Sequence, residues 1–340
     1  MKERIVYLDI LRVICGFFVI VLHVSSQNWS SVDVNTFTWD VFNFFESLTR
    51  FTVPVFVMIS GSLFLNNSMN ITVKNLYKKN ILRLVTAYIG WSFIYAVCLH
   101  IGSWNGIRSF VVDVINGYYH MWFVPMMIGL YILVPVLRMI TADKKVMQYF
   151  IVISVFFCFF VPVMLKLPIL SKFSFFYENM NLYFQLGYVS YFVLGSFLME
   201  KDLGRFTKIV VIGGGLGIIL TCIISKFLSM RAASAIGYYG NDTIPVLLSS
   251  IAVFVGAKYI CSKVVIEDKW KQRIHHCAVY SMGVYFVHPL WVLILKSAGV
   301  NTLIYNPVLS VPLISIIVYI LSVIAVWGVR KIPVIRRLVV

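Results

Sequence analysis

Long apolar runs constrain the fold of this chain more than any other feature of its sequence. Ten such runs of about 20 residues begin near Ile5, Val41, Ile81, Trp122, Met147, Leu182, Lys208, Thr243, Ala278 and Val308. Each is long enough for a helix to cross a hydrocarbon core of about 30 Å, whereas the strands of a membrane barrel would alternate over about ten residues. With 60% hydrophobic and 12% charged residues, the chain has too little polar surface for a soluble globule of 340 residues. The sequence therefore predicts an all-α integral membrane protein with about ten transmembrane helices.

Basic residues are concentrated in alternate loops. The two ends of the chain and every second loop hold 21 of the 29 Lys and Arg, among them Lys2, Arg4, Lys74, Arg138 and Arg330. By the positive-inside rule, this alternation predicts that both termini are cytoplasmic. The formal charge of +16 thus follows from topology, and no nucleic-acid partner is expected. We expect one polytopic domain over residues 1–340, in contact with the lipid bilayer and without an appended soluble domain.

The first apolar run carries polar side chains that lipid disfavours. Residues 8–23 read LDILRVICGFFVIVLH and contain Asp9, Arg12 and His23. In an ideal helix, the eleven residues from Arg12 to His23 make about three turns and rise about 16 Å, so both side chains lie on one face. Asp9 is three residues before Arg12, which favours an ion pair. Because a charge at mid-depth costs about 2.5 to 3.5 kcal/mol, this stripe is expected to face a cavity, or else a packed polar cluster that fixes helix register.

Several segments resemble one protein family. Arg12, followed after ten residues by His23, resembles the Arg-x10-His signature of the transmembrane acyltransferase-3 family. The segment VPVFVMISGSLF is similar to that family's phenylalanine-rich segment ending in Ser-Gly, here Ser60 and Gly61. The segment YKKNILRLVTAY occupies the place of its Arg-x-x-Arg motif, with Asn80 at the first arginine position and Arg83 as the direct match. HMWFVP, GYVSYFVLG and GVYFVHP also resemble family segments, and RFTVPVFVMISG is most similar to the branch that includes enterobacterial common antigen O-acetyltransferase.

The resemblance implies a function. Members of the family move acyl groups from acyl-CoA to extracytoplasmic acceptors, commonly sugars. It implies a multi-pass O-acyltransferase of the cytoplasmic membrane, with acetyl-CoA as donor, a glycan or lipid-linked sugar as acceptor, and no metal. A polytopic carrier for small molecules or amino acids is the alternative, because it would also place Arg, Glu and His along a transmembrane path. A noncatalytic partner in polysaccharide assembly is a third class.

The donor site is expected on the cytoplasmic side, because coenzyme A is made there and carries phosphates. Arg83, Lys79 and Lys78 lie at the start of the expected third helix, where free N–H groups and the helix dipole would add to an anion site. Ordinary membrane anchoring is the alternative for the two lysines. The pantetheine arm would pass Arg12, and Ser60 would form a wall of the thioester tunnel or pack against another helix.

The acceptor chemistry is expected at the outer end. An attacking hydroxyl must lose a proton, and histidine is the side chain whose ordinary pKa suits that step, so His23 is predicted to be the general base. Covalent transfer through its imidazole is an alternative. Glu46 either orients His23 or an acceptor, or forms an intrahelical ion pair with Arg50, one turn away.

Three further residues are candidates for acceptor binding. His120 and Trp122 precede the fourth apolar run on its outer side, where an aromatic ring also fits an interfacial belt. His288 lies in the middle of the ninth run, and a histidine buried in a membrane usually lines a functional cavity. His275 and His276 fall in a basic cytoplasmic stretch and are expected to be solvated.

Overall fold

The computed structural model describes residues 5–66, 71–101, 104, 106–166, 169–180 and 183–332, with side chains of the last range from residue 187 onward. Lys2 and Arg4, which were expected at the cytoplasmic face, lie outside these residues, as do residues 333–340. Within the described residues the protein is helical and contains no strand, so the prediction of an all-α membrane protein is confirmed.

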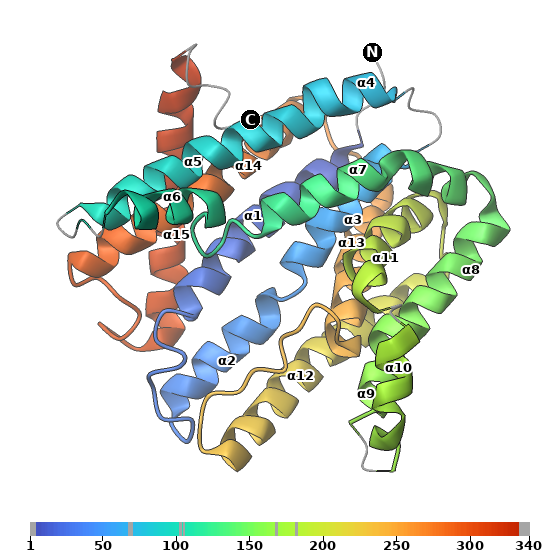
Figure 1. Cartoon of the computed structure of the whole chain (residues 1–340), viewed down its shortest axis with the longest axis horizontal. Coiled ribbons are helices and arrows are strands. Elements are labelled where there is room, and N and C mark those ends of the chain that lie inside the picture. The colour runs from blue at the N-terminus through green and yellow to red at the C-terminus, as the bar shows by residue number, and fades with distance from the viewer. Residues whose placement is uncertain are drawn as a thin grey trace.

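The helices follow one another with short connections (Figure 1). They are α1 (Val6–Ser25), α2 (Phe37–Thr49), α3 (Thr52–Phe64), α4 (Val73–Asn75), the π-helical turn η1 (Leu76–Ile81), α5 (Leu82–His100), α6 (Ile107–Asn116), α7 (Phe123–Ala142), α8 (Lys144–Val155), the π-helical turn η2 (Phe156–Phe160), α9 (Val161–Met164), the 3-10 turn η3 (Ser171–Phe173), α10 (Ser174–Met180), α11 (Tyr183–Glu200), α12 (Phe206–Ala232), α13 (Ile244–Lys263), α14 (Asp268–Ser297) and α15 (Pro307–Lys331).

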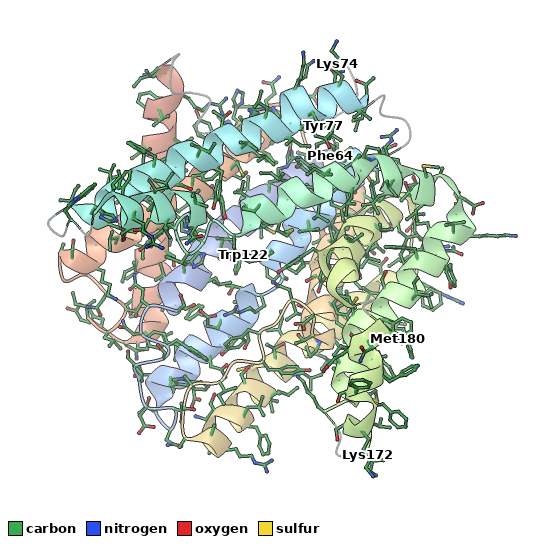
Figure 2. All side chains as sticks on the ribbon, in the orientation of Figure 1. Phe64, Lys74, Tyr77, Trp122, Lys172 and Met180 are labelled. Carbon is green, nitrogen blue, oxygen red and sulfur yellow. The ribbon has the colours of Figure 1, made fainter. Side chains whose placement is uncertain are left out.

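Among the described residues, nine helical stretches are long and apolar enough to cross a membrane. They match nine of the expected runs, from Val6–Ser25 to Pro307–Lys331. The tenth expected span begins at Leu182 and coincides with α11, whose first four side chains are outside the described set. Figure 2 shows Lys74 and Lys172 at opposite ends of the molecule, which is the arrangement that the alternation of basic loops predicts.

The second span is divided into α2 and α3 at Arg50 and Phe51. Pro54 is the physical reason, because it has no N–H to donate to the carbonyl of Arg50, whereas the next residue, Val55, donates to Phe51 at 2.9 Å. The break leaves Arg50 at the junction of the two helices, inside the bundle.

The third span begins earlier than its hydropathy indicates. The hydroxyl of Thr72 caps the helix by accepting from the N–H of Asn75, and the chain then runs through α4, η1 and α5 without interruption. Arg83 therefore lies about three turns inside the helix. The expectation that helix-terminal N–H groups assist Arg83 is wrong, because those N–H groups belong to residues near Val73.

Helix α1 is the central element of the bundle, packed against α14, α3, α15, α2 and α13 (Figure 1). Its buried face includes Leu8, Leu11, Cys15, Ile20 and Val24. One further helix pair, α3 and α11, approaches closely through a glycine on each helix. A Cβ atom on Gly61 of α3 would overlap the backbone of Phe192 in α11, and one on Gly195 of α11 would overlap the backbone of Met58. This close packing fixes α3 against α11, while α3 also packs against α1 and carries Ser60 into the same cavity as Arg12.

Candidate functional site

The candidate functional site is a cavity of about 580 Å³ between α1, α3, α5, α7 and α14. It is lined by six of the residues that the sequence singled out, namely Arg12, His23, Ser60, Arg83, His120 and Trp122. Arg12 and His23 both line it, so the polar stripe of α1 faces a cavity and not lipid, as predicted. Since these residues are eleven positions apart on one helix, the cavity extends about 16 Å along α1.

Near the start of α1, the stripe belongs to a network of polar contacts around Asp9. Nη1 of Arg12 lies 2.7 Å from Oδ1 of Asp9, so the expected pair is confirmed. The other carboxylate oxygen of Asp9 lies 3.0 Å from Nδ1 of His275. The expectation that His275 is solvated is wrong, because α14 begins at Asp268 and carries His275 against α1. His276 on the next position is exposed, as expected.

The middle of the cavity joins three helices through hydroxyl and guanidinium groups. Ser60 on α3 and Tyr131 on α7 both line the cavity with Arg12 of α1. Ser60 thus forms part of the wall. No signal in the sequence marks Tyr131, because the residue lies within an apolar run and has no polar residue three or four positions away.

At the end of the cavity nearest the start of α5, Arg83 and Asn80 line it one turn apart. Lys78 and Lys79 are exposed on η1 and do not line it. Asn80, which stands where the resembling family has its first arginine, presents an amide to the cavity in place of a charge. Sequence reasoning named Asn80 only as a departure from a motif, although its spacing from Arg83 places the two on one helix face.

Three histidines meet in the outer half. The ring of His23 stacks on that of His288 with centroids 5.2 Å apart, and His120 lies 5.5 Å from His288 and 6.5 Å from His23. His288 is fully buried and does not line the cavity, so it lies behind His23 instead of facing an acceptor.

Hydrogen bonds involve the ring of His288 and the backbone carbonyl of His120. Nδ1 of His288 lies 2.8 Å from the carbonyl of Tyr285, which can only accept, so Nδ1 is the protonated nitrogen. The hydroxyl of Tyr285 donates to the carbonyl of His120 at 2.5 Å. Nε2 of His288 and both ring nitrogens of His120 have no hydrogen-bond partner in the part of the chain that the structure describes. The cluster therefore has unused nitrogen atoms close to the cavity.

Glu46 does not line the cavity, and it holds Arg50. Its Oε1 accepts from the hydroxyl of Ser25 at 2.9 Å, and its Oε2 pairs with Nη2 of Arg50. The ion pair that the spacing allowed is thus the arrangement found. The guanidinium of Arg50 also lies 4.3 Å from the ring centre of Tyr239 and faces the cavity near His23. In the sequence, Arg50 stands out only as a partner of Glu46. It lines the cavity because the second span is broken between α2 and α3 at this residue.

The connection between α12 and α13 covers the outer side of the cavity. Burial raises the pKa of Tyr239 although the charge of Arg50 opposes the shift, so its hydroxyl stays protonated and donates to Oδ1 of Asn43. Asn241 lines the cavity, and its amide donates to the hydroxyl of Tyr188 at 2.8 Å.

Trp122 lines the cavity beside this connection. Its ring centre lies 5.8 Å from that of Tyr188, and the indole is 45% exposed. Figure 2 shows Trp122 between the end of the molecule marked by Lys74 and the end marked by Lys172. An accessible aromatic face beside the amide of Asn241 is a surface on which a sugar ring can stack and form hydrogen bonds.

The amino-acid sequence matches a protein-family model described as "Acyltransferase domain" over residues 5–327. No curated protein and no solved structure matches the chain.

Proposed function

The chain belongs to this acyltransferase family and is a multi-pass membrane acyltransferase, and we propose that it carries an acyl group, by default acetyl, from cytoplasmic acyl-CoA to a hydroxyl of an extracytoplasmic or lipid-linked glycan. The observation that carries the proposal is one cavity with Arg83 and Arg12 toward its inner end and His23 and His120 toward its outer end. We place the protein in the cytoplasmic membrane, where acyl-CoA is available on one side only.

In the proposed complex, phosphates of the donor bind Arg83 and Asn80 at the cytoplasmic end. Charged guanidinium groups form strong, directional hydrogen bonds with phosphate. The pantetheine arm lies along the cavity past Arg12, Ser60 and Tyr131, and brings the thioester toward His23. The exposed Lys78 and Lys79 would contribute only general attraction of the anionic donor.

The reaction needs one base. A free ring nitrogen of His23 accepts the proton of the acceptor hydroxyl while the hydroxyl oxygen attacks the thioester carbonyl carbon. A carbon–oxygen bond forms, and the carbonyl electron pair moves onto oxygen to give a tetrahedral oxyanion. Arg50 lines the same part of the cavity and would stabilise this negative charge. Collapse of the oxyanion breaks the carbon–sulfur bond, and the imidazolium returns the proton to sulfur, which yields the acyl ester and free coenzyme A.

We propose that the acceptor enters at the opening formed by Trp122, His120 and Asn241. The half-exposed indole fits one face of a pyranose ring, and the amide and imidazole fit its hydroxyls. His288 was expected to bind substrate. Because it lies buried behind His23, we now assign it to the support of the His23 ring.

The experiment is transfer of acetyl-labelled acetyl-CoA by the purified protein to lipid-linked and surface glycans, followed by mass spectrometry of the glycans. The proposal expects a labelled ester on a sugar hydroxyl, with no transfer by His23→Gln. Label that crosses a proteoliposome membrane without becoming bound to a glycan would favour a carrier and contradict the proposal. Label that remains on the protein at His23 would replace the general-base step by an acyl-imidazole step.

A further inference from the structure

Two arginines at the inner end of the cavity come together from distant parts of the chain. Arg83 of α5 lines the main cavity, and Arg330 in the last turn of α15 contacts the carbonyl of Val279, which lines the same cavity. Neither forms an ion pair with a carboxylate among the described residues. Like charges held near each other without a counter-ion raise the free energy of the fold, unless an anion binds between them.

Arg330 also borders a second pocket. This pocket measures about 330 Å³ and is lined by His275, His276, Val279, Tyr280 and Arg330. Val279 lines the main cavity as well, so the two spaces share a wall on α14. The guanidinium of Arg330 lies 5.0 Å from the ring centre of Tyr280, and its Nη1 contacts the carbonyl of Val279 at 3.4 Å.

We propose that Arg330 and Arg83 together bind a phosphate group of the donor, and that the pocket over Tyr280 takes the purine ring of its nucleotide end. The inference rests on the proposed use of acyl-CoA and adds Arg330 and Tyr280, which do not line the main cavity, to the residues that hold its nucleotide half. A volume of about 330 Å³ lies at the small end of ligand pockets, so it suits a nucleoside better than a phosphate ion alone. A phenol ring, an imidazole and a guanidinium plane are the groups on which a purine stacks.

Two nearby basic residues, Lys331 and Arg273, contact tryptophan rings, as residues that anchor a helix at a membrane surface do. The ammonium of Lys331, the next residue, lies 3.4 Å from the ring centre of Trp327, and the guanidinium of Arg273 lies 4.8 Å from that of Trp270. Neither Lys331 nor Arg273 lines either pocket. Arg330 differs because it faces a pocket beside another arginine. Lys331 is therefore a matched control with the same charge and nearly the same position in the sequence.

The pocket is also connected to the centre of the main cavity. His275 lines the pocket and binds Asp9, and Asp9 binds Arg12. A nucleotide at Tyr280 would thus lie beside the network that orients Arg12, and the pantetheine arm would lead from there into the main cavity.

The test uses the full chain in nanodiscs of zwitterionic lipid, with adenosine 3′,5′-bisphosphate as the probe of the nucleotide site. The probe should compete with acetyl-CoA in the parental protein. Arg330→Ala should weaken its binding by about 10- to 100-fold, the range for a lost charge-assisted hydrogen bond. Lys331→Ala should bind within about twofold of the parent, because surface charges away from the site contribute little. Tyr280→Phe should retain binding and Tyr280→Leu should lose it.

A second measurement separates the nucleotide site from the fold and from the transfer reaction. Acetyl-pantetheine lacks the nucleotide, so Arg330→Ala should use it as well as the parent does, which also shows that the variant is folded. Equal binding of the bisphosphate by Arg330→Ala and parent at low salt would overturn the inference. If anionic lipid displaces the probe from the parent and Arg330→Ala resists this displacement, then the arginines bind a lipid headgroup in a native membrane and the nucleotide assignment is wrong. A parental protein that does not bind acetyl-CoA at all would instead contradict the proposed function.

Discussion

Removing Arg12 should destabilise the protein through the carboxylate that it leaves behind. Asp9 is 7% exposed, and its two oxygens are held by Nη1 of Arg12 at 2.7 Å and by Nδ1 of His275 at 3.0 Å. Loss of one partner from a fully buried ion pair costs about 3 to 5 kcal/mol, whereas an exposed pair contributes about 0.2 to 1 kcal/mol. The side chain of Arg12 is 32% exposed and His275 remains, so we expect Arg12→Ala to lower the free energy of unfolding by about 2 kcal/mol.

The double variant tests the cause. In Asp9→Asn with Arg12→Ala, the remaining amide carries no charge, and most of the lost stability should return. Donor binding should stay weak in both variants, because the guanidinium that faces the cavity is absent. Thermal unfolding in detergent measures the first effect, and titration with acetyl-CoA measures the second. Arg231→Ala is the control, because Arg231 is exposed and makes no ion pair among the described residues. A double variant no more stable than Arg12→Ala would show that the unpaired carboxylate is not the cause.

Four further outcomes are expected. His23→Ala should reduce the transfer rate by about 100-fold or more while donor affinity stays within about twofold of the parent; transfer at the parental rate by a folded variant would rule out His23 as the base. Arg83→Ala should weaken acetyl-CoA binding by about 1.5 to 3 kcal/mol in a titration, and Lys79→Ala by much less because Lys79 does not line the cavity; equal losses would mean that charge near the membrane suffices. Gly61→Ala should destabilise the protein by about 1 to 3 kcal/mol through overlap with the backbone of Phe192, whereas Gly129→Ala, with open space at its Cβ position, should be harmless in the same thermal assay. A reporter fused to the C-terminus should be active only if it works in the cytoplasm, and activity of a periplasmic reporter would reverse the topology.

Local periodicity predicted the part of the site that lies on one helix. Arg12 and His23 share a cavity because eleven residues of α-helix return to the same face, and Asp9 pairs with Arg12 because it is three positions away. The partner of Asp9 across the bundle, His275, is 266 residues distant in the chain, and no local pattern connects them. Tyr131 joins the site for the same reason, because its ring centre lies 4.4 Å from that of Phe64 on α3 and the residue lines the cavity together with residues from other helices.

Hydropathy places the start of the third span too late in the sequence. It marks the residue at which a segment becomes apolar, which is near Ile81, whereas backbone hydrogen bonding starts at Val73. The intervening turns carry Lys78 and Lys79 on an exposed, polar part of the same helix. Arg83 therefore acts through its side chain and its position beside the cavity, without help from a helix terminus. The capping threonine at residue 72 was a signal in the sequence for this earlier start.

The partners of the buried carboxylates explain how so apolar a chain accommodates charged side chains inside the bundle. Asp9 lies between Arg12 and His275, and Glu46 lies between Ser25 and Arg50, so each buried carboxylate has two partners. The guanidinium groups of Arg12 and Arg50 face the cavity, and the carboxylates do not line it. An anionic donor and a developing oxyanion would thus meet positive charge throughout their path, while the acids hold the guanidinium groups in place. This polarity favours binding of an anion that enters from the end that holds Arg83, and it is the opposite of what a pathway for a cation would require.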